Sequence, residues 1–131
     1  MSALVVDTSS WISYFAGSGR PREIETALEE GRVRLPPIVA AELVSGPLGR
    51  RQRADLESFL GDLPLVESDL PHWLRVGALR SRLRARGLTI STPDAHVAQC
   101  ALDLEAELLT EDAAFAQVAR HERLILVKGA R

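Results

Sequence analysis

The hydrophobic pattern of the chain begins with a short uninterrupted apolar run, Ala3–Val6, that ends at Asp7. A strand that is covered on both faces of a parallel sheet does not alternate between apolar and polar residues, so this run predicts a buried strand. Thr8 and Ser9 follow directly, and both residue types are favourable at the start of a helix. We therefore expect Asp7 at the carboxyl end of the first strand, where ligands bind in open α/β sheets.

The remaining pattern alternates between segments with helical spacing of apolar residues and short apolar segments bounded by proline, glycine or polar residues. The expected helices are Ser10–Phe15, Arg22–Glu30, Ile38–Ser45, Arg50–Leu60, Leu70–Arg86, Thr92–Glu105 and Ala113–Arg120. The expected strands after the first are Val33–Leu35, Leu63–Val66, Glu107–Thr110 and Leu124–Val127. Pro64 weakens the prediction for Leu63–Val66, because proline has no N–H to donate to a sheet.

Strands that alternate with helices predict an α/β fold with a parallel sheet of about five strands and helices on both faces. The common strand orders are 3-2-1-4-5 and 2-1-3-4-5. We favour 3-2-1-4-5, which places the first strand beside the fourth and brings Asp7 opposite Asp112. Because the sequence shows no repeat, low-complexity tract or linker, we expect residues 1–131 to form a single domain.

Composition narrows the class of protein. A chain of 131 residues with 46% hydrophobic residues is large enough for one domain with a sizeable core. The single cysteine, Cys100, excludes an intrachain disulfide and a multi-cysteine metal site. No apolar run approaches the roughly 20 residues that span a bilayer, and no signal peptide is evident, so we expect a cytoplasmic protein without membrane contact. The net charge of −2 gives no general affinity for nucleic acid.

Glu42 is the most informative carboxylate, because the segment Ile38–Val44 around it has almost no other polar group. Ile38 and Val39 precede it by four and three residues and share its helix face. An ionised carboxylate on an apolar face is costly unless it is paired or bound to a metal. The alternative interpretation is a residue at the rim of a short helix whose carboxylate reaches solvent.

Three further carboxylates follow predicted strands or begin helices. Asp94 lies in the first turn of a helix and could complement the helix dipole, and Asp112 could cap the last helix. Asp7 is harder to explain in this way, because it ends a buried strand. A cluster of four carboxylates cannot stay ionised in one pocket without a cation. Oxygen ligands favour Mg²⁺ or Mn²⁺ over Zn²⁺, and such an ion activates water and stabilises charge at a phosphodiester.

The histidines do not suggest a competing site. His72, His96 and His121 are scattered and have no metal-ligand spacing, so we expect each to be an ordinary surface or helix residue. Cys100 lies in the middle of a predicted helix and is expected in the core. The sequence therefore indicates no Ser-His-Asp or Cys-His pair for nucleophilic catalysis.

Arginines and aromatic residues each have two interpretations. Arg50, Arg51 and Arg53 open one predicted helix, where they could be solvated or contact the phosphates of a nucleic acid, which supplies affinity without sequence choice. Three neighbouring aromatic side chains are either part of the core or the lining of a groove for a partner helix: Trp11, Tyr14 and Phe15.

Four acidic motifs, taken in order, resemble those of the PIN-domain ribonucleases, and the size and layout of the whole chain resemble the VapC toxins among them. The motifs are Asp7-Thr8-Ser9, Ala41-Glu42-Leu43, Thr92-Pro93-Asp94-Ala95 and Leu109-Thr110-Glu111-Asp112-Ala113-Ala114-Phe115. The resemblance implies metal-dependent cleavage of RNA by an Asp-Glu-Asp-Asp site, formation of a homodimer and inhibition by a VapB-type antitoxin. Many members carry a further acidic residue where Ala114 stands, so the number of metal ions stays open.

The sequence as a whole predicts a Mg²⁺-dependent or Mn²⁺-dependent endoribonuclease toxin. The expected metal ligands, direct or through water, are Asp7, Glu42, Asp94 and Asp112, and the nucleophile is a metal-activated water. The residues expected to orient them by hydrogen bonds are Thr8, Ser9 and Thr110.

Two other functions stay open from the sequence. One is a Mg²⁺-dependent phosphomonoesterase with Asp7 as a covalent nucleophile. Ser9 argues against it, because haloacid-dehalogenase-like enzymes carry a second aspartate at that position. The other is a binding module that kept the fold and lost the activity, against which the four intact carboxylates argue.

Overall fold

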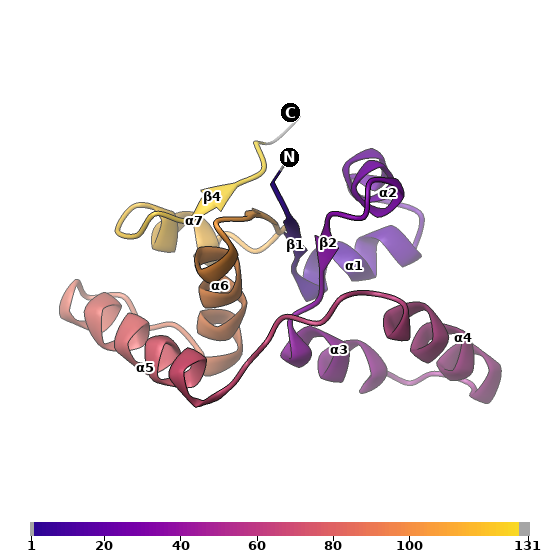
Figure 1. The fold of residues 1–131 in the computed structure, drawn as a ribbon, viewed down its shortest axis with the longest axis horizontal. Coiled ribbons are helices and arrows are strands. Elements are labelled where there is room, and N and C mark those ends of the chain that lie inside the picture. Colours follow the sequence, from indigo (N-terminus) through magenta and orange to yellow (C-terminus); the bar gives the residue numbers. More distant parts are fainter. Residues whose placement is uncertain (1, 129–131) are drawn as a thin grey trace.

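The computed structural model describes residues 2–128, and these residues form four strands and seven helices (Figure 1). The strands are β1 (Leu4–Val6), β2 (Val33–Arg34), β3 (Glu107–Leu109) and β4 (Ile125–Leu126). The helices are α1 (Thr8–Phe15), α2 (Pro21–Glu29), α3 (Pro37–Val44), α4 (Arg50–Gly61), α5 (Leu70–Ala85), α6 (Thr92–Leu104) and α7 (Ala114–Ala119). The α/β class expected from the alternating pattern is confirmed.

The strands form one parallel sheet in the order β2-β1-β3-β4. Leu4 of β1 lies opposite Val33 on one side and Glu107 on the other, so the first strand is central. Its three residues are buried, as the uninterrupted apolar run predicts for a strand that is covered on both faces.

The predicted strand Leu63–Val66 is wrong, and the sheet has four strands within residues 2–128 rather than five. Only an isolated parallel bridge between Leu35 and Leu65 forms there, beside β2, where the order 3-2-1-4-5 placed the third strand. The Pro64 carbonyl accepts a hydrogen bond from the Leu35 N–H at 2.9 Å. Because Pro64 has no N–H of its own, the segment cannot extend this pairing into a regular ladder.

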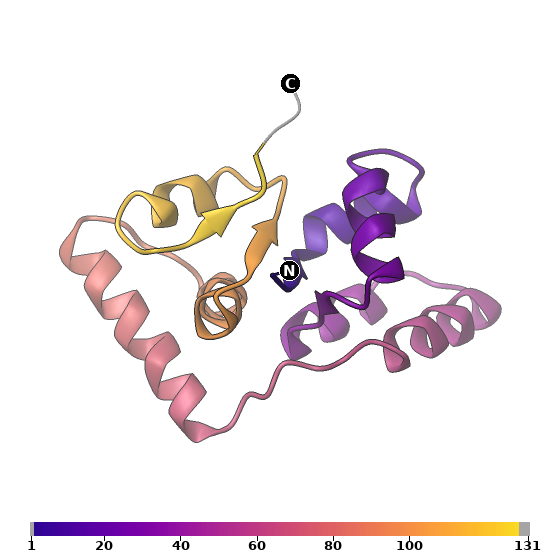
Figure 2. The same ribbon diagram turned by 45° about the horizontal axis from the view of Figure 1, so that its top comes forward.

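Helix α6 connects the sheet to an outer helix. It packs against β1 and β3, and α5 packs along its other side (Figures 1 and 2). Residues 95–101 of α6 are all buried, since the helix is covered on several faces. Four of its buried residues are small apolar ones that let neighbouring elements approach: Ala95, Val97, Ala98 and Ala101.

An aromatic cluster joins α1 to α4. Trp11 is fully buried, with its ring stacked on Phe15 at a centroid distance of 5.6 Å and edge-on to Phe59 at 5.5 Å. Tyr14 lies edge-on to Trp11 and is partly buried. Phe15, at the end of α1, is 47% exposed. Trp11 is therefore core, whereas Phe15 offers an apolar surface.

The N-cap residues of α1 and α6 lie directly before the two helices. Asp7, rather than Thr8 or Ser9, is the N-cap residue of α1, and its side chain makes no capping hydrogen bond. Ser91 is the N-cap of α6, and its Oγ accepts a hydrogen bond from the Asp94 N–H at 3.2 Å. Both helices therefore begin with an acidic residue at or near the first turn.

Within residues 2–128, no helix is long and apolar enough to cross a membrane.

Candidate functional site

Asp7 is the buried centre of the candidate site. Its backbone N–H donates to the Leu109 carbonyl at 2.9 Å, which fixes it where β1 and β3 end side by side. The side chain is 6% exposed, and its Oδ2 accepts hydrogen bonds from Thr110 Oγ1 at 2.9 Å and Ser9 Oγ at 3.2 Å. Burial raises the pKa of the Asp7 carboxyl above its ordinary value of 3.8, although these hydrogen bonds oppose the shift.

Thr110 connects Asp7 to Asp112. Its hydroxyl donates to Asp7 and also accepts a hydrogen bond from the Asp112 N–H at 3.0 Å. The Asp112 carboxylate is exposed, and its Oδ1 accepts from the Ala114 N–H at 2.9 Å at the start of α7. One hydroxyl thus sets the position of two acidic residues that are separated by most of the chain.

Glu42 lies on α3, and its solvation differs from the sequence expectation. The side chain is exposed instead of lying on a buried apolar face, because the buried face of α3 is formed by Val39 and Leu43. Thr8 Oγ1 donates a hydrogen bond to Glu42 Oε1 at 2.5 Å. The contact holds the carboxylate at the first turn of α1, one residue from Asp7.

Asp94 brings the fourth carboxylate to the same place from the first turn of α6. Burial raises the pKa of the Asp94 carboxyl, and the charges of Asp112 and Glu42 raise it further. The charge of Asp94 in turn contributes to the raised pKa of Asp7. Asp94 is therefore coupled electrostatically to each of the other three carboxylates.

No ion pair within residues 2–128 involves any of these four carboxylates. Clustered carboxylates without a cationic partner repel, and a divalent cation relieves that repulsion. Oxygen-only donors of this kind fit a hard ion such as Mg²⁺ or Mn²⁺. The donor set is therefore chemically suited to a metal centre.

A further contact that the sequence did not indicate ties the site to α1. The Glu111 N–H donates to Ser9 Oγ at 3.0 Å, and the Glu111 carboxylate accepts a hydrogen bond from Ser13 Oγ at 2.7 Å. Gly19 lies against the same pair with a φ of +76°, and a Cβ there would meet the Ser13 Cβ at 2.8 Å. Glu111 thus anchors the loop that carries Asp112 to the first helix.

The arginines at the start of α4 divide between two roles. Arg50 and Arg51 are exposed. Arg53 Nη1 donates to the Val44 carbonyl at 2.6 Å, which satisfies a free carbonyl at the end of α3. Arg53 is therefore engaged within the protein, and only the first two arginines offer their side chains to solvent.

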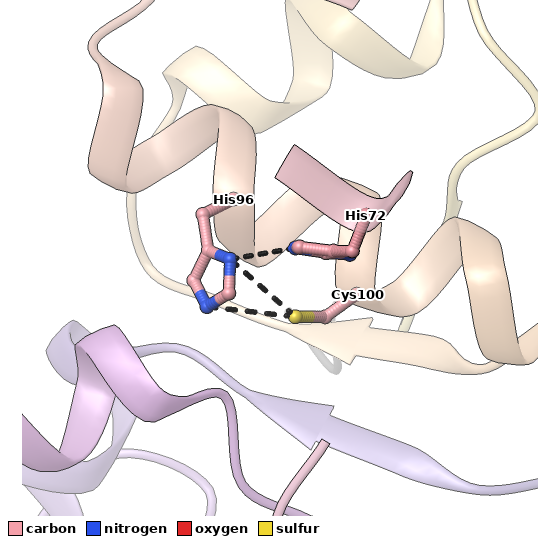
Figure 3. A group of neighbouring side chains, drawn as sticks. All are labelled: His72, His96 and Cys100. Atoms are coloured by element: carbon pink, nitrogen blue, oxygen red, sulfur yellow. Dashed lines mark hydrogen bonds between the residues drawn. The ribbon is translucent and has the colours of Figure 1, made fainter. Parts of the chain in front are cut away.

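A second cluster lies between α5 and α6, which corrects the expectation that the histidines are scattered. His72 and His96 are fully buried and hydrogen-bonded to each other, with His72 Nε2 and His96 Nδ1 2.8 Å apart (Figure 3). Cys100 is buried beside them, 3.7 Å from His96 Nε2. Burial lowers the pKa of His96 to about 4 and raises the pKa of the Cys100 thiol to about 12. His121 is exposed, as expected.

Only part of this second cluster has a local signal in the sequence. His96 and Cys100 are four residues apart and so share a helix face. His72 comes from another helix, 24 residues earlier. Its position depends on how α5 packs along α6, which the hydrophobic pattern does not specify.

Comparison with known proteins gives one family. The family model described as PIN domain matches residues 4–121. The VapC ribonuclease Mb1587 of Mycobacterium bovis and Ribonuclease VapC11 of Mycobacterium tuberculosis are each 28% identical over 123 residues, which cover 89% of this chain and 92% of theirs.

Solved structures with the same fold include DNA-bound VapBC from Salmonella typhimurium, with a TM-score of 0.80 and 18% identity over 97% of this chain and 98% of that one. A toxin–antitoxin complex from Klebsiella pneumoniae has a TM-score of 0.71 and 25% identity over 97% of each chain.

Proposed function

The chain belongs to the PIN domain family, whose model spans most of its length. From that premise we propose that it is a metal-dependent endoribonuclease and the toxin of a VapBC-type toxin–antitoxin pair, with the whole chain forming one domain that acts on RNA in the cytoplasm. The observation that supports the proposal is the electrostatic coupling of Asp94 to Asp7, Glu42 and Asp112, none of which has an ion-pair partner within residues 2–128. Relatives named as VapC ribonucleases, aligned over nine-tenths of the chain, support the substrate class.

The residues that would hold Mg²⁺ or Mn²⁺, directly or through water, are Asp7, Glu42, Asp94 and Asp112. When bound, such an ion lowers the pKa of water and stabilises the charge that develops on the attacked phosphate. The hydroxyls of Thr8 and Thr110 orient the carboxylates of Glu42 and Asp7 through the hydrogen bonds described above. Ser9 supports Asp7 from the other side.

The exposed side chains of Arg50 and Arg51 are proposed to contact the RNA backbone. They stand at the start of α4, and α4 packs against α3, the helix that carries Glu42. Contacts to phosphate position a nucleic acid and add affinity, but they do not read its sequence. Arg53 is left out of this role, because it binds the Val44 carbonyl.

The decisive experiment replaces Asp7 by asparagine. Asp7→Asn removes a charge and almost no volume, so the fold should survive while RNA cleavage is lost. The matched control is Asp62→Asn, an exposed aspartate at the end of α4 that lies outside the cluster. Circular dichroism, cleavage of a mixed RNA substrate and Mn²⁺ titration by calorimetry would be compared for both variants. Cleavage at the wild-type rate by nuclease-free Asp7→Asn would disprove the assignment.

An apolar groove offers a place for the antitoxin. Residues of α1, of α4 and of the segment that joins α3 to α4 line a groove of about 410 Å³, which includes the half-exposed ring of Phe15. The other apolar lining residues are Leu48, Leu56 and Phe59. A groove of this kind accepts the apolar face of an amphipathic helix.

We expect Phe15→Ala to weaken capture of the antitoxin and to leave RNA cleavage by the free toxin unchanged. The antitoxin would be the product of a short neighbouring gene, co-expressed with this chain. Light scattering of the purified toxin tests the homodimer separately. Unchanged capture by Phe15→Ala would place the antitoxin elsewhere on the surface.

A further inference from the structure

Three buried side chains with nitrogen or sulfur donors meet where α5 packs against α6. They are His72 of α5 and His96 and Cys100 of α6, and their ligand atoms all lie within 4.8 Å of one another (Figure 3). We propose that these three residues form a second metal site, which binds a borderline ion such as Zn²⁺ and joins α5 to α6.

The distances between the donor atoms are close to those that one ion requires. His96 Nδ1 is 2.8 Å from His72 Nε2 and 3.9 Å from Cys100 Sγ. Zn–N bonds of about 2.0–2.1 Å and Zn–S bonds of about 2.3 Å separate tetrahedral ligand atoms by roughly 3.3–3.7 Å. Binding therefore requires the two imidazoles to move apart by roughly half an ångström and the thiol to approach both of them, from a cluster whose donor atoms now lie within 4.8 Å of one another.

The surroundings of His72 prepare its Nε2 for a metal. Asp103 Oδ2 lies 2.8 Å from His72 Nδ1 and accepts its proton in a hydrogen bond, which leaves the lone pair of Nε2 directed at the cluster. Arg75 donates two hydrogen bonds to Asp103 at 3.0 Å, and Gln99 donates a third at 2.7 Å. A carboxylate behind a histidine is the usual support of a metal-ligating imidazole.

The chemistry of the cluster separates it from the four-carboxylate site. Two imidazoles and one thiol favour a borderline or soft ion, whereas oxygen ligands favour Mg²⁺ or Mn²⁺. His72, His96 and Cys100 are each 0% exposed, and the ring of Trp73 stacks on His96 at a centroid distance of 4.5 Å. Because the cluster is buried, the ion would enter during folding or a local opening of α5.

A hydrogen-bonded chain is the competing explanation. Asp103, His72 and His96 are linked by hydrogen bonds without any ion, and Cys100 would then only fill space. The two explanations differ in whether the thiol becomes a thiolate bonded to a metal. Cys100 is the only cysteine of the chain, so a thiolate signal can come from no other residue.

The test is a titration of the purified chain with Co²⁺, a spectroscopic substitute for Zn²⁺, in excess Mg²⁺ that saturates the carboxylates. Co²⁺ would be added both to the native protein and during refolding from denaturant. We expect a thiolate-to-cobalt charge-transfer band that saturates at one ion per chain and disappears on addition of Zn²⁺. Absence of the band in both preparations would overturn the proposal and leave the hydrogen-bonded chain.

Three variants test whether the charge-transfer band comes from this cluster. Cys100→Ser should abolish it. Asp103→Asn keeps all three ligands, and we expect it to weaken Co²⁺ binding by roughly 10–100-fold. Asp112→Asn, in the carboxylate site, should leave the band unchanged while lowering RNA cleavage. A Co²⁺ affinity of Asp103→Asn equal to that of the wild type, or a band lost in Asp112→Asn, would contradict the assignment. Because the readout is optical, failure of this site and failure of the proposed ribonuclease are distinguishable.

Discussion

Asp7 combines almost complete burial with an ionisable carboxyl. Its environment raises the pKa of the carboxyl above 3.8, the ordinary value, chiefly through loss of solvent. The protonated form is therefore favoured in the folded state relative to the unfolded one. The stability that Asp7 contributes is present below pH 3.8 and is lost as the pH rises through the raised pKa.

The pH dependence gives a direct prediction for Asp7→Asn in EDTA. At neutral pH the variant should be as stable as the wild type or more stable, because it replaces a buried carboxyl, whose charged form is disfavoured by loss of solvent, with a neutral amide. As the pH falls through the raised pKa, wild-type Asp7 becomes neutral and the difference should shrink. Urea unfolding of both proteins from about pH 7 down to about pH 4 measures it. A difference that stays constant over that range would contradict the assigned pKa shift.

A second prediction at the residue scale concerns Thr110. Thr110→Val keeps the shape of the side chain but removes the donor to Asp7 and the acceptor for the Asp112 N–H. We expect cleavage to fall by roughly 10–100-fold, as for other partners of metal ligands, and stability to fall by roughly 1–3 kcal/mol. Thr110→Ser restores the hydroxyl and is the control. Wild-type cleavage by Thr110→Val would show that the bridge does not position the acids.

At the scale of elements, the helices follow the sequence closely. Every helix begins and ends within two residues of its predicted bounds, because Pro37, Gly87 and similar residues interrupt the apolar periodicity where helices stop or start. A strand was predicted at Leu63–Val66 because the segment is apolar, but no regular strand forms there. Apolar content alone does not show whether a neighbouring strand can pair with a segment along its whole length. The exposure of Glu42 was also mispredicted, because it depends on which face of α3 meets the core.

A prediction at this scale concerns the hydrogen bond between Asp103 of α6 and His72 of α5. Asp103→Ala leaves the buried Nδ1–H of His72 without its acceptor, which should lower the free energy of unfolding by roughly 1–3 kcal/mol. Arg82→Ala removes only the pair with Glu122, in which the arginine side chain is 54% exposed, and should cost about 0–1 kcal/mol. Denaturant midpoints measured in EDTA compare the two. Equal losses would show that the buried histidine does not depend on Asp103.

At the scale of the whole molecule, the candidate site draws one carboxylate from each of four places in the chain. The strand order predicted that Asp7 and Asp112 meet, because strands that neighbour each other end together. Glu42 and Asp94 were assigned to the same site because the four acidic motifs, in their order along the chain, resemble those of the PIN-domain ribonucleases. The meeting of His72 with His96 had no such guide, since two helices that pack along each other leave no periodic signal for their register.

Divalent metal should stabilise the folded chain. Without metal the four carboxylates repel, and an ion that binds only the folded state adds stability by mass action. We expect a higher melting temperature in millimolar Mg²⁺ or Mn²⁺ than in EDTA, and a smaller increase for Asp7→Asn. Equal melting temperatures of the wild type in all three solutions would argue against a preformed carboxylate site.

The central position of β1 also limits when the candidate site can assemble during synthesis. Asp7 is synthesised 103 residues before its partner Thr110. Until then β1 also lacks β3, its neighbour on that side. Strands that are so far apart in the sequence pair late, and this slows folding. A nascent chain therefore carries Asp7 before Thr110 and Asp112 exist, so the candidate site cannot assemble until β3 and the loop after it have been synthesised.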